Sequence, residues 1–192
     1  MGYLDNLGDY LAKNYEVSVF DTAISSGKPW ELHLHGHRTV RAVVLENRKW
    51  DITVDLVGQG REEIQKIQVK YLCPAEAGES IKPLLKMDQT VEALKLEPIF
   101  NPRKRYFVKN KSLYPLMKEK QVVLFTLLEG DVLRGIIADF SRYDVTLGMK
   151  GGLPVTILRH SIYDVRNKRG RCFLKVFQEE HRDWEKSPLY IS

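Results

Sequence analysis

Long apolar runs, cysteines and targeting signals are all scarce in this chain of 192 residues. No apolar run reaches about 18 residues, which argues against a membrane-spanning helix. The first residues lack the basic-then-apolar layout of a secretion signal, and Asn6 stands where an acylation motif needs Ser or Thr. The two cysteines, Cys73 and Cys172, are too few for a disulfide framework, and we expect both to be reduced thiols. We therefore expect a cytoplasmic protein that does not enter a membrane.

Catalytic and metal-binding signatures are equally scarce. The sequence has no nucleophile elbow, no phosphate-binding glycine loop and no paired acid and base in a plausible frame, so we expect neither an enzyme nor a cofactor. His33, His35 and His37 alternate, and three imidazoles on one face of a strand could bind Zn²⁺. Gly36 falls where this strand should turn, so His37 would not share a face with the other two histidines. We therefore expect no metal site.

The main positive feature is a repeat. Residues 134–147 (RGIIADFSRYDVTL) match residues 41–54 (RAVVLENRKWDITV) without a gap at an offset of 93 residues. Arg, Asp and Thr are identical at three positions, and most other pairs are near-equivalents. Upstream, Gly130 needs one inserted residue to meet Gly36, a change that a turn tolerates. Two copies of one small β module are the simplest account.

Each copy has the pattern of a helix followed by strands. In the second copy the spacing predicts a helix over 113–120, and β-branched or aromatic runs between turn signals predict five strands, over 122–128, 132–140, 143–149, 156–158 and 161–165. In the first copy we expect one or two short helices within 1–26 and a core from Trp30 to Leu72. The connection carries a helical pattern over 81–96, and another follows over 172–184.

A helix followed by five short, strongly bent antiparallel strands resembles the Sm-like fold, and the details are similar to the Hfq family of bacterial RNA chaperones. The matching features are the glycine after the first strand, Phe140-Ser141-Arg142-Tyr143 where the family usually reads Phe-Asp-x-Phe, and Leu158-Arg159-His160 where it usually reads Tyr-Lys-His. The resemblance implies a mainly β (α+β) protein with two tandem Sm-like modules. Each would be a short N-terminal helix plus a five-stranded bent antiparallel sheet, an SH3-like open barrel. The expected divisions are a degenerate module (1–73), a linker with a helix (74–111), an Hfq-like module (112–166) and a C-terminal extension (167–192).

The same resemblance implies binding of single-stranded, U-rich RNA on one face of a ring, by an RNA chaperone or post-transcriptional regulator. In the family the matching positions form a uridine-preferring pocket between adjacent subunits. By that match Tyr143 would stack a base, Arg142 and Arg159 would contact phosphate or base, and His160 would donate to sugar or phosphate. Further RNA contacts are expected from Phe140, Lys118 and Lys120, and in the first copy from Lys49, Trp50 and Lys66.

Charge and assembly extend this expectation. Residues 102–120 carry seven Lys or Arg against one Glu, as expected if a polyanion meets this half, although a solvated surface would have the same composition. Since Hfq-like rings have six modules, three two-module chains would close one, and we expect a homotrimer. Three alternatives stay open. Tyr143 and His160 could be ordinary interface and turn residues, and the ring could be a protein scaffold without RNA function. The basic cluster 103–105 also permits, without favouring it, a DNA-binding or phage-type accessory protein.

Overall fold

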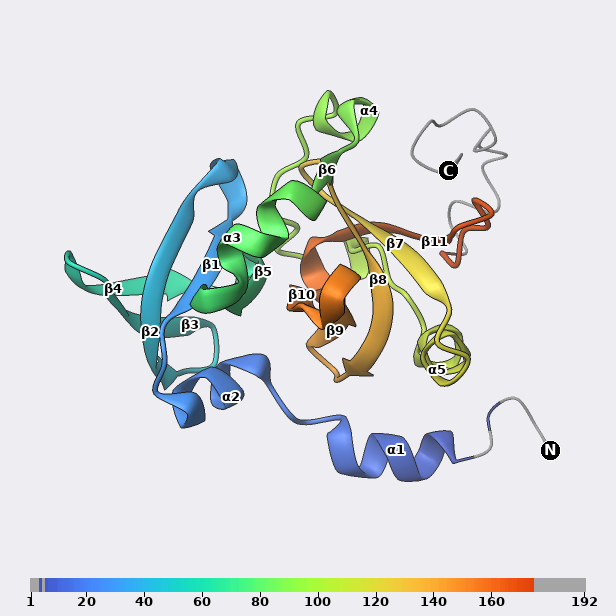
Figure 1. The fold of residues 1–192 in the computed structure, drawn as a ribbon, viewed down its shortest axis with the longest axis horizontal. Helices are drawn as coiled ribbons and strands as arrows, with labels where there is room; N and C mark the ends of the chain where they lie inside the picture. The colour runs from blue at the N-terminus through green and yellow to red at the C-terminus, as the bar shows by residue number, and fades with distance from the viewer. Residues whose placement is uncertain (1–3, 5, 175–192) are drawn as a thin grey trace.

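The described part of the chain, residue 4 and residues 6–174 of the computed structural model, is mainly β (Figure 1). It forms eleven strands, all paired antiparallel in one open sheet. The strands are β1 (Trp30–Leu34), β2 (Thr39–Asn47), β3 (Asp51–Leu56), β4 (Gly60–Gln65), β5 (Val69–Pro74), β6 (Lys86–Met87), β7 (Val122–Leu127), β8 (Asp131–Phe140), β9 (Asp144–Gly148), β10 (Pro154–Leu158) and β11 (Ile162–Asn167). Their order is β11-β7-β8-β9-β10-β5-β1-β2-β3-β4, and β6 pairs with β8.

Short helices and turns accompany the strands. The helices are α1 (Leu7–Asn14), α2 (Val19–Ser26), α3 (Gly78–Ile81), α4 (Gln89–Glu92) and α5 (Asn110–Lys118). The 3₁₀ turns that matter below are η1 (His35–His37), η2 (Lys66–Gln68), η5 (Pro102–Lys104) and η7 (Arg159–Ser161). Within residues 4 and 6–174, no helix combines the length and hydropathy that crossing a bilayer requires.

The two halves of the sheet repeat each other's register. Each half is a helix followed by five strands, α2 with β1 to β5 and α5 with β7 to β11. Val44 pairs with Val54 in the first half, and Ile137 pairs with Leu147 in the second, which is the same pair moved by 93 residues. A register shift follows Val44 and Ile137 alike. Such bulges bend a strand, so the longest strand of each half turns at the same place.

The offset of 93 also holds through the first turn of each half. His33 pairs with Thr39, and Thr126 pairs with Val132, again at the same spacing. Gly130 therefore matches His37 and not Gly36. The sequence-based prediction of one inserted residue in this turn was wrong. Gly130 and His37 both have positive φ, 91° and 56°. This backbone conformation favours glycine, but a few other residues also adopt it. Because a histidine takes it in the first half and a glycine in the second, the match between the two positions was not visible in the sequence.

The halves join through β10 and β5, the fourth strand of one half and the fifth of the other. Thr156 pairs with Leu72, and Ile157 pairs with Tyr71. Beside this pairing the Lys70 side chain, 2% exposed, places Nζ 2.6 Å from Glu129 Oε2 and 2.6 Å from Asp131 Oδ2. Burial alone would raise the pKa of Glu129, but hydrogen bonds from Lys70 and from the Gly36 N–H hold that pKa below its ordinary value.

The segments outside the two halves differ from the sequence expectation. The prediction of a continuous helix over 81–96 was wrong, because α3 and α4 are two separate short helices. Pro83 lacks the N–H that a helix interior needs, and β6 leaves the helical path to pair with β8. Helix α1 packs on the second half, where the Tyr10 ring lies 4.8 Å from the Phe140 ring. Most of the helical pattern over 172–184 lies outside the described residues.

The two outer strands of the sheet are not alike. Among the described residues β4 is paired with β3 alone. The outer edge of β11 is partly occupied by the chain itself, because Phe173 N donates to Val165 O at 2.9 Å and Arg166 bridges to Cys172. Cys73 and Cys172 are both buried, and within the described residues neither of them forms a disulfide.

Candidate nucleic-acid interface

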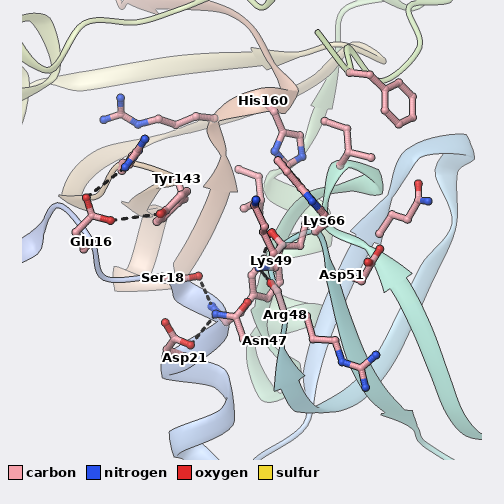
Figure 2. Close-up of a pocket in the computed structure, with 18 of the residues that line it drawn as sticks. Glu16, Ser18, Asp21, Asn47, Arg48, Lys49, Asp51, Lys66, Tyr143 and His160 are labelled. Atoms are coloured by element: carbon pink, nitrogen blue, oxygen red, sulfur yellow. Dashed lines mark hydrogen bonds and ion pairs between the residues drawn. The ribbon is translucent and has the colours of Figure 1, made fainter. Parts of the chain in front are cut away.

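A cavity of about 920 Å³ opens between the two halves (Figure 2). This volume is at the upper end of the range of small-molecule sites, about 300 to 1,000 Å³. Seven of the expected RNA-binding residues line it, namely Lys49, Trp50, Lys66, Arg142, Tyr143, Arg159 and His160. The junction thus brings together residues that are far apart in the sequence and come from both copies.

The repeat explains why these residues meet. Trp50 follows β2, and Tyr143 follows β8 at the matching position of the other half. Lys66 in η2 and Arg159 in η7 are matched in the same way. Since β10 pairs with β5, the turn that follows β10 is held against the first half, and both aromatic loops border one cavity.

Two of the expected residues have large exposed rings at this cavity. Trp50 is 71% exposed, and Tyr143 is 44% exposed. Lys49 Nζ lies 5.1 Å from the centre of the Trp50 ring, and the Arg142 guanidinium carbon lies 5.9 Å from the centre of the Tyr143 ring. A cation beside an exposed ring matches what a nucleotide requires, because the base can stack while the phosphate meets the charge.

One carboxylate already stands at this position. Glu16 Oε2 accepts from the Tyr143 hydroxyl at 3.3 Å, and Glu16 Oε1 lies 3.5 Å from Arg142 Nη1 (Figure 2). Arg142 N also donates to Tyr15 O at 2.7 Å, which ties the segment between α1 and α2 to this loop. The Glu16 carboxylate therefore already contacts the Arg142 guanidinium, the group that a phosphate would contact.

The side chains of His160 and Arg159 each use one nitrogen for a hydrogen bond within the protein. His160 Nε2 lies 2.9 Å from Val69 O, and because a carbonyl oxygen only accepts, this nitrogen carries the hydrogen. Burial lowers the pKa of His160 to about 4, against a weaker opposing effect of that hydrogen bond. The ring is therefore neutral at pH 7, and Nδ1 is an acceptor. No ring N–H of His160 is left for the donation to sugar or phosphate that the resemblance implied. Arg159 Nη2 donates to Asn110 Oδ1 at 2.8 Å, and burial lowers its pKa to about 10.

Three expected RNA contacts lie elsewhere. Phe140 is 1% exposed and belongs to the core. It ends β8, whose side chains alternate between faces, so the expectation that it touches RNA was wrong. Lys118 and Lys120 are exposed at and just beyond the end of α5, and they do not line the cavity.

The cavity also has lining residues that the sequence did not single out. Among them are Glu16 and Asn47, and, from the connection between the halves, Phe100 and Arg105. Among the described residues, six Lys or Arg side chains line the cavity against three carboxylates. The run of basic residues at 103–105 was visible in the sequence, but only the fold shows that this segment reaches the junction.

The histidine triplet does not form a metal cluster in the described chain. There, the group with ligand atoms within 4.8 Å of one another is Glu31, His33 and Cys73. Glu31 already accepts from Arg41 Nε at 3.0 Å and contacts His33 Nε2 at 3.0 Å. Burial raises the pKa of Cys73 to about 12, so its thiol stays protonated at pH 7. A metal ion would have to displace both existing contacts and this proton.

The cavity combines exposed rings, cations and a neutral imidazole, which suits a nucleotide ligand better than a catalytic step. Comparisons with protein-family models, with curated proteins and with solved structures find no match to this chain. The chemistry of this cavity is therefore the basis for a functional proposal.

Proposed function

We propose that this chain is an RNA-binding protein of the Sm-like, Hfq-like type. It binds single-stranded, U-rich RNA at the junction cavity and acts in the cytoplasm as an RNA chaperone or post-transcriptional regulator. The observation that carries the proposal is the meeting of two exposed rings, Trp50 and Tyr143, with six cations at one cavity. Proteins read single-stranded RNA by stacking splayed bases on aromatic rings and holding the phosphates with Arg and Lys.

The proposed role of each residue at the cavity depends on which of its atoms can still contact RNA. Tyr143 and Trp50 offer ring faces, and Arg142 and Lys49 offer charge. Since Nε2 of His160 is used, its Nδ1 is left to accept a hydrogen bond from a 2′-hydroxyl or from the N3–H of uracil. A 2′-hydroxyl contact would distinguish RNA from DNA. Lys118 and Lys120 are assigned to a separate contact with the RNA backbone at the end of α5.

The arrangement of the halves supports the two-module proposal. Each half is a helix followed by five bent antiparallel strands, which resembles one Sm-like module. Sm-like modules associate by pairing the fourth strand of one with the fifth of the next, and β10 pairs with β5 in this way. We propose that residues 1–73 and 112–166 contain the two modules.

We further propose that three chains close a six-module ring through the two outer strands. In this ring β4 of one chain would pair with β11 of the next, as β10 pairs with β5 within the chain. At the offset of 93 residues, Glu63 would then lie opposite Val165 of the next chain, and Ile64 opposite its Asp164. Phe173 N now donates to Val165 O, so this short segment must leave the edge before a neighbour can pair. Closure would remove both exposed edges.

The ring proposal makes a prediction about Phe173. Phe173→Pro removes the N–H that donates to Val165 O, so we expect a larger share of the species with three times the 22.3 kDa chain mass. Phe173→Ala loses the ring but keeps the N–H, and it should assemble like the unmodified chain. Light scattering after size-exclusion chromatography measures both. Equal masses for the two variants would contradict the proposed role of this hydrogen bond.

Glu16 gives a second prediction. Because the Glu16 carboxylate contacts Arg142 and the Tyr143 hydroxyl, we expect Glu16→Gln to tighten binding of oligo(U) by up to about fivefold, the scale of one exposed ion pair. Glu92→Gln in α4 changes the net charge equally and does not line the cavity. Fluorescence anisotropy at one salt concentration compares them. Equal gains in the two variants would mean that only the net charge matters.

The second candidate function is a scaffolding ring without a specific RNA role. It is favoured by the protein contacts already made at the cavity, from Glu16 to Arg142 and from Val69 to His160. Nucleic acid that co-purifies with the protein separates the two functions. The RNA proposal expects a raised ratio of absorbance at 260 nm to 280 nm that falls after a high-salt wash. A low ratio before the wash, together with no binding of added oligo(U), would favour the scaffold.

A further inference from the structure

We infer that the connection between the halves supplies a third stacking position, Phe100, which extends the RNA path out of the junction cavity towards the basic segment 103–105. This inference rests on the proposed function and concerns a segment outside both repeats. Phe100 and Arg105 line the same cavity as Trp50 and Tyr143. The site would then bind a short run of nucleotides and not one base alone.

The exposure of Phe100 is the first observation. Its side chain is 66% exposed although it is large and apolar, and it lies at a cavity that already has two exposed rings. The three rings come from three separate segments, after β2, after β8 and within the connection. Exposed rings beside cations form the platform on which single-stranded nucleic acids stack without a strict sequence requirement.

The second observation is that the segment around Phe100 is held in place. Arg105 Nε donates to Ile99 O at 2.8 Å, and Arg105 Nη2 donates to Phe100 O at 3.3 Å. Asn101 Oδ1 accepts from Arg103 N at 3.0 Å at the start of η5. Phe100 is therefore presented by a closed turn, which reduces the entropy that binding would otherwise cost.

The third observation is charge. Arg103 and Lys104 are exposed in the turn η5, three and four residues after Phe100 in the chain. In the described part of the chain, the carboxylates that line the cavity belong to other segments, Glu16 and Asp21 at the N-terminal side and Asp51 at the start of β3. A strand that leaves the cavity along the connection would thus meet cations for its phosphates.

Phe107 provides a matched control for Phe100. It lies in the same connection and is 64% exposed, but it does not line the cavity. The experiment measures anisotropy of a labelled oligo(U) of about nine nucleotides with the unmodified chain and with Phe100→Ala, Phe107→Ala and Tyr143→Ala. Removing one stacking ring weakens binding by about five- to a hundredfold. We expect that loss for Phe100→Ala and not for Phe107→Ala, with circular dichroism unchanged in both.

The outcomes separate this inference from the proposed function. If the unmodified chain does not bind oligo(U), both fail. If it binds, and Tyr143→Ala loses affinity while Phe100→Ala does not, the third stacking position is wrong and the proposed function stands. Equal losses in Phe100→Ala and Phe107→Ala would also overturn it. Photo-crosslinking with 5-iodouridine placed along the oligonucleotide gives an independent result, and we expect crosslinks to Phe100 from a position next to the one that crosslinks to Tyr143.

Discussion

Replacing Tyr143 with alanine is expected to weaken binding of U-rich RNA by about five- to a hundredfold. The ring is 44% exposed at the cavity, and loss of one base–aromatic stack costs about 1 to 3 kcal/mol. Trp50→Ala should also weaken binding, because Trp50 lines the same cavity. The variant that lacks both rings should bind only through phosphate contacts. Equilibrium anisotropy with oligo(U) measures each loss.

Tyr143→Phe is the control for this experiment. It keeps the ring face but removes the hydroxyl that donates to Glu16. We expect its affinity to equal or exceed that of the unmodified chain, since stacking is kept and Glu16 is released. A loss as large as that of the alanine variant would assign the effect to the hydroxyl and contradict a stacking role.

Replacing Lys70 with alanine should lower the free energy of unfolding by about 3 to 5 kcal/mol, the cost of breaking a buried ion pair by removing one partner. Lys70 is 2% exposed and contacts both Glu129 and Asp131 across the junction. Without it two carboxylates face each other with no cation between them. Because the cavity lies at the same junction, we also expect RNA affinity to fall. Urea unfolding measures the first effect.

Two further variants test the cause of this destabilisation. The combination of Lys70→Met, Glu129→Gln and Asp131→Asn removes all three charges, and it should recover most of the lost stability. Lys104→Ala removes an exposed lysine and should change the free energy of unfolding by less than about 0.5 kcal/mol. If Lys70→Ala were as mild as Lys104→Ala, the ion cluster would not hold the halves together.

The strands could be predicted because the repeat and the alternation of apolar residues are local properties. The predicted strand over 132–140 is observed as β8, and the predicted helix over 113–120 as α5, each within a few residues. The matching positions Trp50 and Tyr143 were visible as well. The observed register repeats at the offset that the sequence match gives.

Other features depend on contacts between distant segments. The broken helix over 81–96 depends on the pairing of β6 with β8, which no local pattern reveals. The partners of His160 and Tyr143, which are Val69 and Glu16, are 91 and 127 residues away in the chain. The resemblance therefore indicated seven of the residues that line the cavity, but not which of their atoms remain free.

The most direct test of RNA binding at the junction cavity is a salt series. Anisotropy of labelled oligo(U), oligo(A) and oligo(dT) with the purified chain, repeated at several salt concentrations, separates phosphate contact from base recognition, because phosphate contacts weaken steeply with salt. We expect RNA to bind more tightly than DNA, U more tightly than A, and a preference for U that persists at moderate salt and is lost in Tyr143→Ala. Binding that is indifferent to base and sugar, and is abolished by moderate salt, would contradict a nucleotide site at this cavity.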